Sequence, residues 1–301
     1  MKVARDHLFT LGERGGFNGF WMRLDNLDDA GRPTGQVTVM RAVRNWAGLH
    51  FEGVIHEGPI LPAPSDICVM APEVLRLAHL GYSPSVVVRK RKFERNTALL
   101  RRLLDTNPED RGAHRYMGVE LQSAGMLPEA VSHFRQALGL ECPAPDLPWV
   151  WLDSACRLAE CLRLTKRPAE AVVMCDKVLR DYPDYAELLL ERAMVTPGYA
   201  EALPYFQAAR TRYDRTVWHM TPQPELPAFA AYGAAWCCEQ LGRAAEALTL
   251  YREAAADPDG RPQVRADAEA AIARLAGPRW WAPAEGGSSL IISGGGSVLL
   301  P

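Results

Sequence analysis

This sequence lacks several features that would assign a function directly. Neither sign of charge is in excess, because 34 Lys and Arg stand against 36 Asp and Glu, a formal net charge of -2. Proteins whose main partner is nucleic acid usually carry a strong basic excess, so this balance argues against that class. No window approaches the ~18 uninterrupted apolar residues of a transmembrane helix. The first residues show no apolar segment of a secretory signal.

Sequence motifs of several enzyme and metal-binding classes are also missing. The seven cysteines include no CxxC pair. We interpret them as buried, reduced residues of a cytoplasmic protein rather than a disulfide or zinc framework. A P-loop, a dinucleotide fingerprint and a nucleophilic triad are not found. Three nearby glycines, Gly12, Gly15 and Gly16, lack the strand–turn–helix context of a phosphate loop.

Residues 17–57 have the pattern of a small antiparallel set of strands. Residues 17–24 are rich in aromatics, residues 25–35 crowd Asp, Asn, Gly and Pro, and residues 36–44 alternate β-branched with polar residues. A third strand is expected from His50 to His56. Such a set cannot bury an apolar face alone. We therefore expect later helices, or a larger sheet, to cover it.

The clearest helix before residue 110 is predicted over residues 86–105. Apolar residues recur there every three or four positions and define one face. The rest is basic, with Arg89, Lys90, Arg91, Lys92, Arg95, Arg101 and Arg102. This face has two interpretations, a surface for anions or nucleic acid and a solvated face offset by acidic residues of later helices. The second is favoured, because the whole chain is not basic.

Residues 110–275 carry an internal repeat. The pattern A-x3-F-x2-A, typical of the second helix of a tetratricopeptide (TPR) unit, recurs as Ala130-Phe134-Ala137, Ala171-Cys175-Val178, Ala202-Phe206-Ala209 and Ala247-Tyr251-Ala254. It predicts four stacked helix pairs and a final capping helix. Such a solenoid typically binds a peptide or protein on its inner surface. The candidate partner-binding residues are Arg115, Glu120, Arg157, Glu160, Glu191 and Arg192. The alternative is that they are ordinary exposed helix residues.

Five ordered sequence pieces point to a family. They are a strand pair with a Gly-containing turn, then R-x-x-R-N, F-x-G-x-I-H-E, H-x-G-Y and K-x-x-R-N-x-x-L-L. Their residues are Arg41, Arg44, Asn45, Phe51, Gly53, Ile55, His56, Glu57, His79, Gly81, Tyr82, Lys92, Arg95, Asn96, Leu99 and Leu100. Together they resemble bacterial family 2 glycosyltransferases that carry C-terminal TPR repeats.

The resemblance implies that the β segment is the end of a GT-A-type α/β domain. It implies catalytic roles for His56 and Glu57, with His56 also a metal ligand, and substrate-binding roles for Arg41, Arg44 and Asn45. The alternative is that His56 and Glu57 only end a strand. The family's Asp-x-Asp motif, which holds Mn or Mg and the donor pyrophosphate, lies well before the corresponding strands and is not found there. Asp257-Pro-Asp259 has the same spacing, but it falls at a repeat boundary and is interpreted as a helix-end turn. We therefore expect no cofactor in this chain and no activity from it alone.

The expected fold is mainly α, a TPR-like solenoid preceded by a small antiparallel β segment. We expect a transferase-like segment over 1–82, a connecting helix over 83–109, repeats over 110–275 and a flexible tail over 276–301. Two functions follow. The chain is the C-terminal portion of an enzyme that moves a sugar from a nucleotide-sugar to a protein, peptide or glycan, or it is a non-catalytic scaffold for protein partners. Neither nucleic acid nor a membrane span is expected.

Overall fold

A computed structural model describes residues 6, 8, 10, 17–45, 49–52, 55, 58–60, 67–69, 75–80, 83, 85, 91–139, 149–214 and 223–276. These residues form two compact units, the first up to Glu120 and the second from Leu121 onward. The described strands all lie in the first unit, and the elements of the second are all helices. The chain is therefore mainly α, as the sequence predicts. The boundaries at 82, 109 and 275 stay predictions.

The first unit is built around a β-hairpin. Its strands β1 (Gly19–Leu27) and β2 (Pro33–Val43) pair antiparallel along their whole length. Because side chains alternate along a strand, β1 buries Phe20, Met22 and Leu24 on one face. The two predicted strands of the hairpin are therefore observed, and they supply a small core.

The sheet around this hairpin is mixed, not purely antiparallel as the sequence analysis expects. Strands β5 (Ile67–Val69) and β6 (Arg76–His79) both pair with β1 in the parallel sense. Strands β3 (His50–Glu52) and β4 (Gly58–Ile60) form a separate antiparallel pair. The two strands of a hairpin are joined by a short turn that the sequence pattern can indicate, but a parallel partner follows only after a long connection. Local pattern therefore could not reveal β5 and β6 as partners of β1.

Two helices complete the first unit and begin the repeats. The predicted helix over 86–105 is described as α3 (Lys92–Thr106), and α4 (Arg111–Ser123) follows it. One face of α3 is buried, with Leu100 fully so. On that face the Asn96 side-chain amide donates a hydrogen bond to Glu120 of α4 at 2.6 Å. This bond joins the connecting helix to the first repeat helix.

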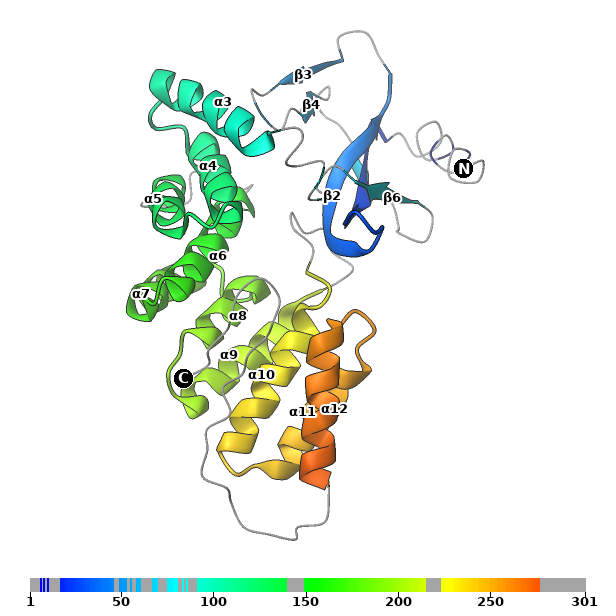
Figure 1. The fold of residues 1–301 in the computed structure, drawn as a ribbon, viewed down its shortest axis with the longest axis vertical. Helices are drawn as coiled ribbons and strands as arrows, with labels where there is room; N and C mark the ends of the chain where they lie inside the picture. Colours follow the sequence, from blue (N-terminus) through cyan, green and yellow to red (C-terminus); the bar gives the residue numbers. More distant parts are fainter. Residues whose placement is uncertain are drawn as a thin grey trace. The chain divides into compact units, whose positions relative to one another are not determined.

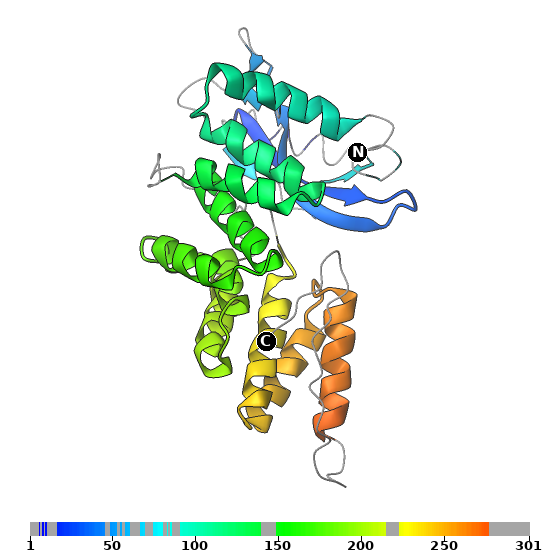
Figure 2. The ribbon, with the colours of Figure 1, turned by 60° about the vertical axis from the view of Figure 1, so that its left-hand side comes forward.

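The second unit is a run of helix pairs (Figure 1). The bounds are α5 (Leu127–Leu138), α6 (Trp149–Leu164), α7 (Pro168–Leu179), α8 (Ala186–Met194), α9 (Tyr199–Arg212), α10 (Leu226–Gln240), α11 (Ala244–Ala256) and α12 (Pro262–Ala276). Consecutive helices pack on each other, and α10, α11 and α12 lie side by side (Figure 2). This is a TPR-like solenoid, in which α4, α6, α8 and α10 are the first helices of the pairs and α5, α7, α9 and α11 the second.

The repeat signature marks the core of this solenoid. All twelve signature residues of α5, α7, α9 and α11 are at most 4% exposed. A small residue there lets two backbones approach. The same need appears in α10, where a Cβ on Gly233 would lie 2.4 Å from the Phe206 ring of α9. The signature is therefore a packing pattern, and the sequence predicts it correctly.

Three of the turns between paired helices close in the same way. The amides of Met126, Arg167 and Arg243 donate to the carbonyls five residues earlier, Leu121, Leu162 and Cys238, at 2.8–2.9 Å. This closure needs the preceding residue in the left-handed conformation. Gly125 and Gly242 supply it with φ of 76° and 74°, whereas Lys166 adopts φ of 58° in the α6–α7 turn.

Candidate partner-binding strip on the first helices

Polar side chains on the first helices hold neighbouring repeats together. The Gln122 amide of α4 donates to the Glu160 carboxylate of α6 at 2.7 Å. Its carbonyl oxygen accepts from Arg157 of α6 at 3.1 Å. Arg157 also pairs with Asp153 on its own helix at 2.9 Å. One amide therefore joins two charged side chains of opposite sign across the repeat boundary.

The next boundary carries a two-bonded ion pair. Arg163 of α6 donates to both carboxylate oxygens of Glu191 on α8, at 3.0 and 3.3 Å. Each side chain is 13% exposed. Burial raises the pKa of Glu191 above its ordinary value, and the Arg163 charge only partly opposes this. Burial lowers the pKa of Arg163, but Glu191 and Glu160 outweigh it, so that pKa is raised overall.

We call Gln122, Arg157, Glu160, Arg163 and Glu191 the polar strip. A similar link occurs further along, where Arg274 of α12 donates to Glu239 of α10 at 2.8 Å. Tyr251 of α11 donates to the same carboxylate at 2.9 Å. Polar side chains of the first helices thus bridge the α4–α6 and α6–α8 boundaries, and α10 is bonded in a similar way to the final helix α12.

These linking residues share a place in the sequence. Gln122, Arg163 and Glu239 each stand eight residues before the first alanine of their repeat signature. Neither Gln122 nor Arg163 is among the partner-binding residues predicted from the sequence. The signal that would have found them is this fixed offset, because a polar residue at the same repeat position recurs on the same side of the first helix.

The structure brings three of the six predicted partner-binding residues together, Arg157, Glu160 and Glu191. The guanidinium of Arg192 is instead directed at the second helix of the preceding pair. It donates to Asp176 of α7 at 2.6 Å, bonds Thr196, and lies over the Tyr205 ring at 4.7 Å. Its edges and one face are therefore occupied within the chain.

The other two predicted residues lie in the first unit. Arg115 of α4 is 5% exposed, and its guanidinium lies 5.0 Å from the centre of the Tyr116 ring. Glu120 accepts the hydrogen bond from Asn96. A partner-binding role for Arg115 and Glu120 stays a prediction.

Neither of the two predicted catalytic residues can be placed. His56 and Glu57 lie outside the described residues, and so does the predicted tail from residue 277 onward. Arg41 and Arg44 are exposed near the end of β2, with Asn45 beside them. Their roles in substrate binding stay predictions.

Among the described residues, no three His, Cys, Asp or Glu side chains gather to hold a metal ion. None of the described helices is long and apolar enough to cross a membrane.

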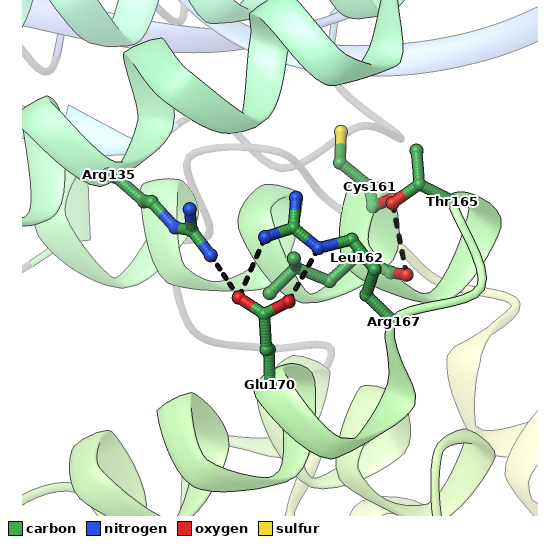
Figure 3. A network of polar contacts seen from close by, with 6 residues as sticks. All are labelled: Arg135, Cys161, Leu162, Thr165, Arg167 and Glu170. Atoms are coloured by element: carbon green, nitrogen blue, oxygen red, sulfur yellow. Dashed lines mark hydrogen bonds and ion pairs between the residues drawn. The ribbon is translucent and has the colours of Figure 1, made fainter.

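The second helices carry a different, exposed kind of network (Figure 3). Glu170 at the start of α7 accepts from Arg167 at 2.6 and 2.8 Å, and it also bonds Arg135 of α5. The hydrogen bond from Arg167 lowers the pKa of Glu170. Because these side chains are about half exposed, water screens the pairs and they stabilise the fold little. Substitutions at exposed ion pairs of the second helices are therefore suitable controls.

Four cysteines of the second unit are packing residues. Cys161, Cys175, Cys237 and Cys238 are buried and reduced. Burial raises the pKa of Cys161 to about 12. A thiol with such a pKa stays protonated and unreactive at neutral pH. This agrees with the interpretation of these four residues from the sequence.

Comparisons with protein families and with curated proteins give no match. They therefore do not support the glycosyltransferase resemblance, which stays a prediction.

Among solved structures, the chain is similar to YrrB, described as a TPR protein with an unusual peptide-binding site. The identity is 19%, the match covers 62% of this chain and 88% of that one, and the TM-score is 0.46. BtubC from P. vanneervenii matches at 16% identity over 62% and 80%, with a TM-score of 0.47. MamA matches at 13% over 56% and 90%, with a TM-score of 0.44. Likenesses of this strength say nothing about function.

Proposed function

We propose that this protein is a binding scaffold whose first helices hold an extended segment of a protein partner. The observation that carries the proposal is the polar strip, whose hydrogen-bonding groups come from successive first helices. Stacked helix pairs place their first helices in a row, so an extended chain can follow them. Repeat positions with equivalent side chains then offer that chain similar contacts one after another.

The pairing within the polar strip indicates which groups the partner uses. A charged partner group would have to displace the bidentate pair of Arg163 and Glu191, which is mostly buried, and breaking such a pair is costly. Gln122 and Glu160 are only half buried and joined by one neutral–charged hydrogen bond. We therefore expect the partner to present backbone amides and carbonyls, or uncharged polar side chains, to Gln122 and Glu160.

The test begins with peptides selected from a random library on the full 301-residue chain. The dissociation constant of a selected peptide is then measured by fluorescence anisotropy for Gln122→Ala and Glu160→Ala. Each lost hydrogen bond should weaken binding about five- to tenfold. Glu253→Ala on α11 is the matched control, since Glu253 bonds Arg210 on the second helices, and it should bind like the unsubstituted protein. Equal affinities for all variants would contradict the proposal.

A role in sugar transfer rests only on the five sequence pieces. The corresponding test is calorimetric titration with UDP-sugars and manganese, with His56→Ala and Glu57→Ala as controls. Binding that both substitutions weaken would support a donor site in this chain. A folded protein that binds no UDP-sugar would leave the scaffold as its function. A cytoplasmic location likewise stays a prediction.

A further inference from the structure

One stretch of the sequence concentrates positive charge in an otherwise balanced chain. Residues 89–102 contain seven Lys or Arg and one acidic residue, Glu94, while the whole chain has a net charge of -2. Within α3 and its cap, Arg91, Arg95 and Arg102 follow at spacings of four and seven. These spacings place them on one helix face. All three are exposed, and so is Arg101 beside them.

These arginines have few acidic partners. The Arg91 guanidinium lies 3.9 Å from Glu94, and both side chains are mostly exposed. Arg95 donates to the neutral amide oxygen of Asn96. Among the described residues, neither Arg101 nor Arg102 has a side-chain hydrogen bond or ion pair, in contrast to most arginines of the repeats.

Several carboxylates of the repeats are already paired within the repeats. Glu170, Glu191, Glu239, Glu246 and Glu253 each pair with an arginine of the repeat helices themselves. The alternative predicted from the sequence is a solvated face balanced by acids of the later helices. These five carboxylates are instead engaged within the repeats, and on α3 itself the two acids Glu94 and Asp105 do not balance the four arginines Arg91, Arg95, Arg101 and Arg102.

We propose that the face of α3 with Arg91, Arg95, Arg101 and Arg102 docks on an anionic phospholipid surface. From Arg91 to Arg102 the face extends about 16 Å along a straight helix. That helix is fixed from behind by the fully buried Leu100. A negatively charged bilayer attracts each such arginine without needing a shaped pocket. Single-stranded nucleic acid usually also requires exposed aromatic side chains for stacking, and Phe93, the aromatic residue of α3, is half buried.

The experiment is co-sedimentation of the full chain with vesicles of phosphatidylcholine alone or with about 40% phosphatidylserine. We expect binding only to the anionic vesicles at about 50 mM salt, and its loss at about 500 mM salt. The triple variant Arg91→Gln/Arg101→Gln/Arg102→Gln should lower the vesicle partition coefficient roughly 100-fold. These side chains make no buried contact, and circular dichroism checks that the variant is folded. Arg101→Gln/Arg102→Gln, expected to lose roughly tenfold or more, serves if the triple variant does not fold.

The matched control removes three exposed charges from the repeats, Lys177→Gln/Arg180→Gln/Arg252→Gln, and should bind like the unsubstituted chain. Three outcomes would overturn the proposal. They are no binding to anionic vesicles at low salt, an equal loss in the control, and binding to a single-stranded oligonucleotide or an acidic peptide but not to vesicles.

Discussion

The left-handed residue in the α6–α7 turn gives a prediction that isolates backbone strain. Lys166 adopts φ of 58° at the position where the equivalent turns have Gly125 and Gly242. A residue with a Cβ pays roughly 1–2 kcal/mol for this conformation. Glycine avoids that strain but loses roughly 0.5–1 kcal/mol more chain entropy on folding. We therefore expect Lys166→Gly to raise the free energy of unfolding by about 0.5–1 kcal/mol.

The reciprocal change is Gly242→Ala. Its new Cβ would meet nothing within 4 Å, so the backbone alone sets the cost, which should be about 1 kcal/mol or more. Lys166→Ala removes the charge but keeps the Cβ, and should not stabilise. Urea denaturation monitored by circular dichroism measures all three variants. A stabilising Gly242→Ala, or an equal gain from Lys166→Ala and Lys166→Gly, would refute the reasoning.

Three further predictions concern packing, a buried hydrogen bond and pH. Gly233→Ala should destabilise the second unit by roughly 1–3 kcal/mol in urea denaturation, because the new methyl overlaps the Phe206 ring. Adding Phe206→Leu should recover part of this lost stability, and no recovery would argue against the overlap. Trp151→Phe removes a buried donor that lies 2.7 Å from the Leu138 carbonyl and should cost roughly 1–3 kcal/mol in the same assay; an unchanged unfolding midpoint would count against that bond. The hydrogen bond from Arg243 lowers the pKa of Glu246 below its ordinary value. A carboxyl group with a lowered pKa stabilises the fold at pH values above its unfolded pKa, and this stabilisation is lost as the pH falls through its folded pKa. The difference in free energy of unfolding between the unsubstituted chain and Glu246→Gln should therefore be largest near neutral pH and vanish in acid. A difference that grows in acid would contradict this prediction.

Sequence pattern was most informative where the fold repeats itself. The alanines and aromatics of the signature are buried because two helix backbones must approach, and that need leaves the same mark in every pair. Lys166 breaks the pattern in one turn. Its backbone conformation could not be predicted, because the surrounding helix ends impose it on a residue that rarely adopts it alone.

The sites were less predictable than the fold, for a related reason. Arg157, Glu160 and Arg192 look alike as polar residues of first helices, yet the first two face Gln122 and the third faces α7. The direction depends on where each side chain lies around its helix relative to both neighbours. In the first unit, the parallel partners of β1 come after long connections, so local sequence pattern does not predict their pairing with β1.

The central claim is that a partner lies along the first helices. Hydrogen exchange of the full chain, with and without a selected peptide, tests it most directly. We predict slower exchange of amides in the first helices α4, α6 and α8, which carry the polar strip, and in α10, and an unchanged rate in the second helices α7, α9 and α11. Protection confined to the second helices, or to the strands of residues 19–79, would contradict the account.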